Sequence, residues 1–327
     1  MRASDAEPGD PMSATMVAKG LCSWIPGARV FYDRRAAHGT GSAAYCYGVW
    51  MKHLALRWAS GAPAPHGTVV ELGPGESIGT GVAALLSGAE RYVAIDKVAH
   101  MRPEANLALF HELVEMFRAR APRPKPGFPP IEEYLDERLF PSAILDEKTL
   151  ARTLHPERLA RIERAVRALG TGKPDPMLGY FTWDDPQPVG DGSVDLAFSH
   201  VVLNHVTDLE GLYAQCARWL KPGAWMSHHI DFSCLGTSKT WNGHRAYGDL
   251  TWRLITGKRP YFVNREPPQY HERLLDRLGF DVVRVIRGHR EGGITRAQLA
   301  PRFRAISDED LDTWSAFMVS RRRVLQK

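Results

Sequence analysis

The 327-residue sequence has few cysteines and no long apolar run. Cys22, Cys46, Cys216 and Cys234 are widely spaced and form no C-x-x-C pair, so the sequence shows neither a cysteine zinc motif nor a disulfide framework, and a reducing cytoplasm is expected. No stretch of about eighteen apolar residues occurs, which excludes a predicted membrane span. The N-terminus is acidic and lacks the apolar core of a secretory signal, so residues 1–12 are expected to form a disordered tail.

The sequence also lacks a strong charge of either sign. Lys and Arg number 42 and Asp and Glu number 37, which gives a formal net charge of +5. This mild excess permits an anionic substrate or a nucleic acid but requires neither. The arginines of the predicted helix 148–169 alternate with Glu157 and Glu163, as on a solvated helix face, so nucleic acid is not the expected partner.

The most informative stretch begins with the apolar run 68–72 and continues through Gly73-Pro74-Gly75. A helix is predicted over 79–86, and a second apolar run ends on Asp96, whose carboxylate can accept hydrogen bonds from a ribose diol. Strand, glycine turn, helix and acidic strand end form half of a nucleotide-binding α/β unit. NAD-binding folds share these pieces but carry G-x-G-x-x-G at the turn. Here the acidic Glu71 and Glu76 favour a cationic ligand over a pyrophosphate.

The segment Glu71-Leu72-Gly73-Pro74-Gly75 resembles motif I of the class I S-adenosylmethionine (SAM) dependent methyltransferases. A second string follows about 120 residues later, in the order and spacing that the same family shows after its fourth strand. It consists of Asp191-Gly192-Ser193-Val194-Asp195, then Val202-Leu203-Asn204-His205-Val206-Thr207-Asp208-Leu209, then Trp219-Leu220-Lys221-Pro222-Gly223-Ala224. Asn204 stands where the family usually has an acid, and Ala224 replaces a glycine. The resemblance covers residues 66–96 and 178–287.

The resemblance implies an α/β fold with a Rossmann-like seven-stranded methyltransferase sheet, mostly parallel with an antiparallel last strand and helices on both faces. We predict an N-terminal helical cap over 13–65 and a SAM-binding domain over 66–327. Within that domain, residues 97–177 are predicted as a helical insertion and 232–266 as a substrate loop. The implied SAM contacts are Glu71, Gly73, Gly75, Asp96, Thr182, Trp183 and Ser199.

Methyl transfer to a hydroxyl requires a base, and histidine has a suitable pKa. The candidates are His200, His229 and His205, with Asp231 as an orienting carboxylate. No metal ligand is assigned, although a site made of a histidine and Asp231 is an alternative. The polar and aromatic loop after the predicted strand 225–230 is expected to bind the substrate. Its proposed contacts are Asn242, His244, Tyr247 and Arg265.

These residues favour a cytoplasmic SAM-dependent methyltransferase that modifies a small molecule, most simply a hydroxyl of a sugar or secondary metabolite. N- or S-methylation is an open alternative, as is a homodimer. RNA methylation has less support, because the Asn/Asp-Pro-Pro-Tyr string and a Pro-Cys nucleophile are both missing. A SAM-fold protein without catalysis is a further alternative, and the complete glycine turn and Asp96 argue against it.

Overall fold

The computed structural model describes residues 14–25, 41–99, 101–124, 127–169, 171, 175–185, 189–259 and 262–324. The predicted tail 1–12 lies outside these residues. Among the helices that they form, none combines the length and apolar character needed to span a bilayer.

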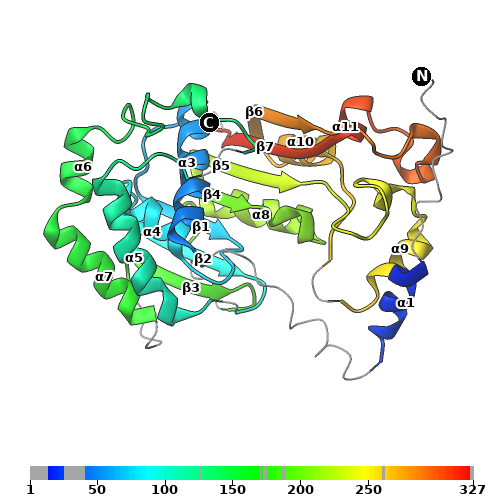
Figure 1. Cartoon of the computed structure of the whole chain (residues 1–327), viewed down its shortest axis with the longest axis horizontal. Coiled ribbons are helices and arrows are strands. Elements are labelled where there is room, and N and C mark those ends of the chain that lie inside the picture. Colours follow the sequence, from blue (N-terminus) through cyan, green and yellow to red (C-terminus); the bar gives the residue numbers. More distant parts are fainter. Residues whose placement is uncertain are drawn as a thin grey trace, which may run out of the picture.

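A seven-stranded sheet with the order β3-β2-β1-β4-β5-β7-β6 forms the centre of the molecule (Figure 1). Strands β1 to β5 pair in parallel, and β7 pairs antiparallel with both β5 and β6. The predicted sheet, including its antiparallel last strand, is confirmed. The strands are β1 (Thr68–Leu72), β2 (Arg91–Asp96), β3 (Leu178–Thr182), β4 (Val194–His200), β5 (Leu220–Asp231), β6 (Phe280–His289) and β7 (Thr313–Arg322).

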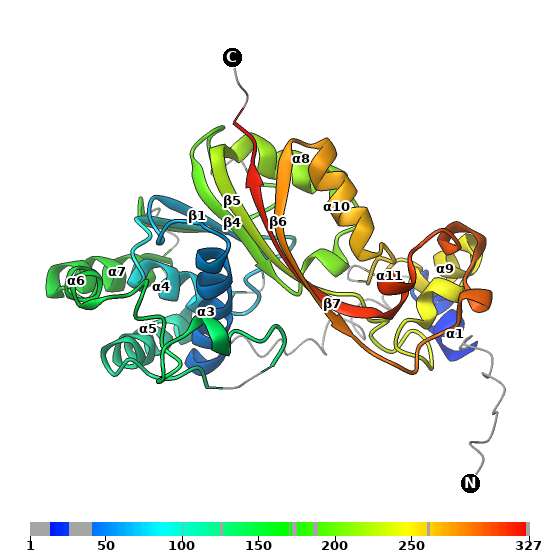
Figure 2. The ribbon, with the colours of Figure 1, turned by 90° about the horizontal axis from the view of Figure 1, so that it is seen from above.

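Helices cover both faces of the sheet (Figure 2). On one face, α3 (Ala43–Ala59), α4 (Gly79–Leu86), α5 (Pro103–Arg118), α6 (Glu147–Thr153) and α7 (Pro156–Leu169) contribute to one apolar cluster. On the other face, α8 (Leu209–Trp219) and α10 (Pro268–Arg277) contribute to a second. Buried strand side chains alternate between these clusters, as the two-residue period of a strand requires. The fold class predicted from the sequence is therefore correct.

Several predicted helices are shorter or broken. The periodic stretch 148–169 forms two helices, α6 and α7, because Pro156 begins a new helix and cannot continue the preceding one. The stretch 201–220 contains a 3₁₀ turn at Leu203–His205, and its α-helix begins only at Leu209, where Asp208 caps the amide of Gly211. Residues 294–313 contain two 3₁₀ turns and the short helix α11 (Asp308–Asp312).

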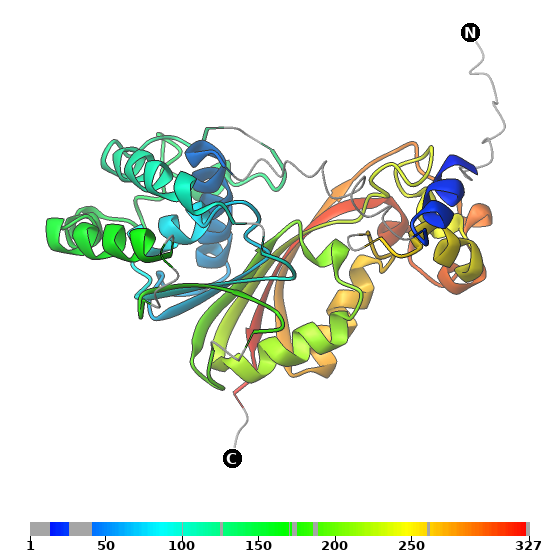
Figure 3. The ribbon, with the colours of Figure 1, turned by 90° about the horizontal axis from the view of Figure 1, so that it is seen from below.

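A smaller lobe lies beyond the ends of β5, β6 and β7 (Figures 1 and 3). It contains α1 (Ala14–Cys22), α9 (Asp249–Thr256) and α11. α1 packs closely on α9, since a Cβ on Gly20 would lie 1.9 Å from the carbonyl oxygen of Leu254. The predicted cap 13–65 is thus divided between two places, with α1 in this lobe and α3 against the main sheet.

Candidate functional site

The carboxyl ends of five neighbouring parallel strands meet at one edge of the sheet, where open α/β sheets bind ligands. These ends carry Leu72, Asp96, Thr182, His200 and Asp231. The strand register places Asp96 beside Thr182 and His200 beside His229. The fold therefore gathers the predicted SAM contacts and two of the predicted bases along one edge.

The glycine turn after β1 has the backbone geometry that the sequence predicts. Gly73 and Gly75 have φ angles of +69° and +76°, a region in which a side chain is strained. The Gly73 amide donates to the Ile95 carbonyl at 2.8 Å, which fixes the turn beside the end of β2. A Cβ on Gly73 would lie 2.6 Å from the Val202 side chain, so the turn also lies against the segment that follows β4.

The two acids beside this turn, Glu71 and Glu76, have different surroundings in the structure. Glu71 is buried and accepts a hydrogen bond from the Tyr92 hydroxyl, and burial raises its pKa to about 8. Glu76 lies 3.6 Å from Arg102, measured between their charged side-chain atoms. The preference for a cationic ligand therefore cannot rest on two free carboxylates, and Glu71 faces the core in this structure.

The residues expected around the ribose and adenine lie at the ends of β2 and β3. Asp96 is partly exposed, and its carboxylate accepts the Lys97 amide at 2.8 Å. The Trp183 amide donates to the Asp96 carbonyl at 2.8 Å. Trp183 is half-buried, with its ring edge-on to Trp219 at a centroid distance of 5.9 Å. A glycine turn beside a partly exposed acid and an aromatic ring fits SAM, whose ribose hydroxyls an acid in this position can bind.

His200 belongs to a group of three histidine rings in hydrogen-bond contact. His53 Nε2 lies 3.3 Å from His200 Nδ1, and His200 Nε2 lies 3.2 Å from His229 Nδ1. His53 is fully buried and His229 is 7% exposed, whereas His200 is partly exposed. Burial, followed by repulsion from other rings and Lys52, holds the pKa of His200 well below its usual value. The ring that can meet a ligand is therefore neutral at pH 7.

The preceding residue on each strand, Ser199 on β4 and His228 on β5, points to the opposite face. Ser199 and His228 form a buried pair, with Ser199 Oγ 2.8 Å from His228 Nδ1. The Tyr213 hydroxyl and His271 Nδ1 form a second pair on this face at 2.9 Å. Ser199, predicted to contact the cofactor, is fully buried here, and that role remains untested.

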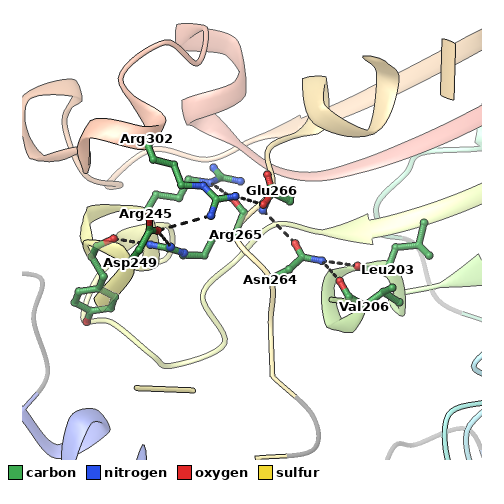
Figure 4. A network of polar contacts seen from close by, with 9 residues as sticks. Leu203, Val206, Arg245, Asp249, Asn264, Arg265, Glu266 and Arg302 are labelled. Carbon is green, nitrogen blue, oxygen red and sulfur yellow. Dashed lines mark hydrogen bonds and ion pairs between the residues drawn. The ribbon is translucent and has the colours of Figure 1, made fainter. Parts of the chain in front are cut away.

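His205 and Asp231 also lie near this edge but outside the histidine group. His205 occupies the 3₁₀ turn after β4 and is partly exposed. Asn264 holds this turn, since its side-chain amide donates to the carbonyls of Leu203 and Val206 at 2.7 and 2.9 Å (Figure 4). Asp231 accepts the Ser233 amide at 2.8 Å, so its carboxylate caps a turn.

The four predicted substrate contacts are all buried in the smaller lobe. Asn242 donates to the Leu311 carbonyl and accepts the Ile294 amide. Tyr247 donates to the Thr237 carbonyl at 2.9 Å. These bonds connect segments of the lobe, so Asn242 and Tyr247 serve packing in this structure, and their contact with a substrate remains untested.

The other two predicted substrate contacts, Arg265 and His244, also have little contact with solvent. Arg265 bonds to Asp249 at 2.6 Å and lies between the rings of Trp252 and Phe303, within the network of Figure 4. His244 is 1% exposed, and burial holds its pKa well below the usual value. We therefore do not include His244 or Arg265 among the residues proposed to contact the methyl acceptor.

Sequence reasoning missed two residues at the histidine group, His53 and Phe128. His53 comes from α3, and its ring packs against Phe198 and Phe317. Tyr45, two turns earlier on α3, is 39% exposed and presents its ring edge to His200 at 6.4 Å. Phe128, from the segment between α5 and α6, has its ring centroid 5.5 Å from that of His229. Helical spacing places Tyr45 and His53 on one side of α3, but only the fold shows what that side meets.

Comparison with known proteins gives a family match over the middle of the chain. Residues 151–227 match the family described as "Methyltransferase domain". This stretch includes β3, β4, α8 and the first part of β5. No curated protein matches the sequence.

Solved structures with a similar arrangement include several methyltransferases. One from Bacillus halodurans, described as a putative methyltransferase, has a TM-score of 0.41 and 11% identity, covering 84% of this chain and 100% of that one. A SAM-dependent methyltransferase from Mesorhizobium loti has a TM-score of 0.41 and 17% identity, covering 83% and 100%. Phosphoethanolamine N-methyltransferase 2 from Haemonchus contortus has a TM-score of 0.44 and 14% identity, covering 92% and 61%.

The comparison with methyltransferases rests on the family match and on the arrangement of the strands. The matched segment contains the second string that the sequence shares with methyltransferases, and the seven-stranded sheet with its antiparallel β7 is the one that the resemblance predicts. Residues 151–227 therefore form a methyltransferase domain, and the sheet around them is consistent with a class I SAM-dependent methyltransferase.

Proposed function

We propose that this methyltransferase acts on a hydroxyl group of a small molecule, such as a sugar or secondary metabolite, with His200 as the general base. The observation that carries the proposal is the partial exposure of His200 at the carboxyl end of β4. His53 and His229, its two hydrogen-bond partners, are buried. Only a ring that reaches the ligand edge can take a proton from an acceptor.

The cofactor contacts proposed for this chain are Gly73, Gly75, Asp96, Thr182 and Trp183. Bound SAM supplies a methyl group on a positively charged sulfonium. The turn of Gly73 and Gly75 allows close approach to the backbone, and Asp96 accepts hydrogen bonds from the ribose. Glu71 and Ser199, both buried, are omitted.

The charge balance supports a neutral histidine as base. Methyl transfer removes the positive charge of the sulfonium, and a proton arriving on His200 creates a new positive charge nearby. Before transfer, the low pKa keeps His200 neutral and able to accept that proton. The total charge of the site is thus unchanged by the reaction, which limits the cost of forming an imidazolium in a partly buried place.

Titration calorimetry with SAM and with its demethylated product tests the first half of the proposal. We expect both to bind, and Asp96→Asn to weaken binding roughly 10- to 100-fold, because a hydrogen bond to a charged group is worth about 1.5–3 kcal/mol. Asp191→Asn, in an exposed turn far from this edge, is the control and should bind normally. Absence of binding by the unaltered chain would overturn the cofactor site.

Radiolabelled SAM with a panel of small alcohols, amines and thiols tests the acceptor class. We expect transfer to alcohols and a large loss of this transfer in His200→Ala. Transfer to a thiol or amine that survives His200→Ala would favour S- or N-methylation, because such an acceptor needs less help from a base.

A further inference from the structure

The histidine group forms a longer chain that ends on a serine at each side. At one end, Ser227 Oγ lies 2.7 Å from His53 Nδ1. At the other end, His229 Nε2 lies 2.8 Å from Ser315 Oγ. The order Ser227–His53–His200–His229–Ser315 therefore joins α3 to strands β4, β5 and β7. His53, Ser227 and Ser315 are fully buried.

The direction of every bond in this chain follows from its Ser315 end. The Ser315 hydroxyl donates its single proton to the Ile230 carbonyl at 3.0 Å, and a carbonyl can only accept. Ser315 must then accept from His229, which is protonated on Nε2. His229 Nδ1 is therefore an acceptor, and the same reasoning applies to each ring in turn. His200 donates from Nε2 to His229, His53 donates from Nε2 to His200 Nδ1, and Ser227 donates to His53 Nδ1.

This direction decides which ring and which atom can act as base. His229 and His200 both use their two ring nitrogens inside the chain, but His229 is buried whereas His200 is partly exposed. His200 Nε2 carries a proton, so only its Nδ1 has a basic lone pair. In the resting chain, that lone pair accepts from His53 over 3.3 Å, longer than the usual 2.9–3.0 Å of an N–H bond. The contact is weak enough for an acceptor hydroxyl to replace.

We propose that His229 and Ser315 are positioning residues that hold His200 as its Nε2–H tautomer, and that the methyl acceptor gives its proton to His200 Nδ1 in place of His53. The acceptor O–H bond breaks and an N–H bond forms at Nδ1, while the O–CH₃ bond forms and the S–CH₃ bond breaks. His200 becomes an imidazolium that still donates to His229. This inference rests on the proposed function, because it assigns the atom and the supports of the same base.

The charged surroundings of the chain favour neutral rings before the reaction. Burial is the main cause that lowers the pKa of all three rings; Lys52 also repels a proton on each, and Arg57 and His228 repel one on His53. Lys52 donates to the Phe128 carbonyl at 2.8 Å, and burial lowers its own pKa to about 8. A chain of neutral rings needs a defined direction, since two N–H groups facing each other would leave one buried donor without a partner.

Nitrogen-15 NMR of histidine-labelled protein tests the chain without any methyl transfer. We expect His53, His200 and His229 of the unaltered chain to be Nε2–H tautomers. Ser315→Ala removes the acceptor that sets the direction, so all three rings should change to Nδ1–H, with His53 donating to Ser227. Ser227→Ala is the matched control, because this serine lies at the open end, and the three tautomers should stay as they were. Nδ1–H rings in the unaltered protein would overturn the inference, whatever the enzyme methylates.

Activity and cofactor binding separate this inference from the proposed function. We expect Ser315→Ala to lower kcat roughly 10²- to 10⁴-fold, the range for loss of a general base, with an unchanged affinity for the demethylated cofactor. Ser315→Thr keeps a hydroxyl and should restore most of the rate. Equal rates in Ser315→Ala and Ser227→Ala would overturn the positioning role even if SAM binds and alcohols are methylated. Failure of SAM to bind would overturn the proposed function. The histidine tautomers seen by NMR would still test the direction of the hydrogen-bond chain.

Discussion

The two faces of the sheet at β4 and β5 carry similar residues with different surroundings. On the α3 face, His200 and His229 belong to a chain that reaches the ligand edge. On the α8 face, Ser199, His228, Tyr213 and His271 form pairs that are all at most 1% exposed. Both faces lower the pKa of their histidines by burial. The difference shows that access to the ligand edge, and not an unusual pKa, distinguishes a candidate base from a structural histidine.

The largest expected effect compares His200→Ala with His228→Ala. The first removes the proposed base and should lower kcat by about 10²- to 10⁴-fold. The second removes a ring that faces only the interior, so kcat should change little while stability falls. Steady-state rates with a methylated alcohol, together with urea unfolding, measure both. A loss of kcat as large for His228→Ala as for His200→Ala would break the comparison.

A smaller effect concerns the free energy of unfolding at acid pH. Here His228 on the α8 face and His229 on the α3 face should behave alike. Burial lowers the pKa of His228 and of His229 from the usual value to about 3. The unfolded chain binds more protons between pH 3 and 6.5, so stability is present above this window and is lost as pH falls through it. Each such ring contributes up to about 1.4 kcal/mol per pH unit. Removing either ring should weaken this dependence equally.

The measurement is the free energy of unfolding in urea at pH 7 and pH 5.5 for the unaltered chain, His228→Gln and His229→Gln. We expect both variants to lose about 1.4 kcal/mol less than the unaltered chain over this interval. A variant that loses as much stability as the unaltered chain would show that its ring already titrates normally in the folded protein.

The smallest expected effect on the ligand edge tests whether Ser199 is structural. Ser199→Ala leaves His228 Nδ1 without its partner and should cost about 1–3 kcal/mol of stability. Because Ser199 is fully buried, affinity for the demethylated cofactor should be unchanged. A clear loss of affinity by calorimetry would instead support the cofactor contact that the sequence resemblance implies.

The sequence predicted the main sheet well because its signals are local. Short apolar runs, the glycine turn and Asp96 fix β1, α4 and β2 within about thirty residues. The predictions were weaker where proline or an early cap intervenes, as at Pro156 and Asp208. They were weakest for the substrate loop, where Asn242 and Arg265 have the composition of a binding site yet are buried in internal bonds.

By itself, the sequence indicated the resemblance to methyltransferases, the seven-stranded sheet with its antiparallel last strand and the set of histidines from which a base can be chosen. Two motifs and the period of the apolar residues suffice for these predictions, since each motif and each strand pattern depends on residues that are close together in the sequence. The glycine turn was also predicted from the sequence, whereas the structure shows that Glu71 beside it is buried. Only the tertiary structure showed that His200 is partly exposed and that His53 and Ser315 belong to the same hydrogen-bond chain. Their contacts join residues 147 and 86 positions apart, and such pairings are decided by packing across the sheet.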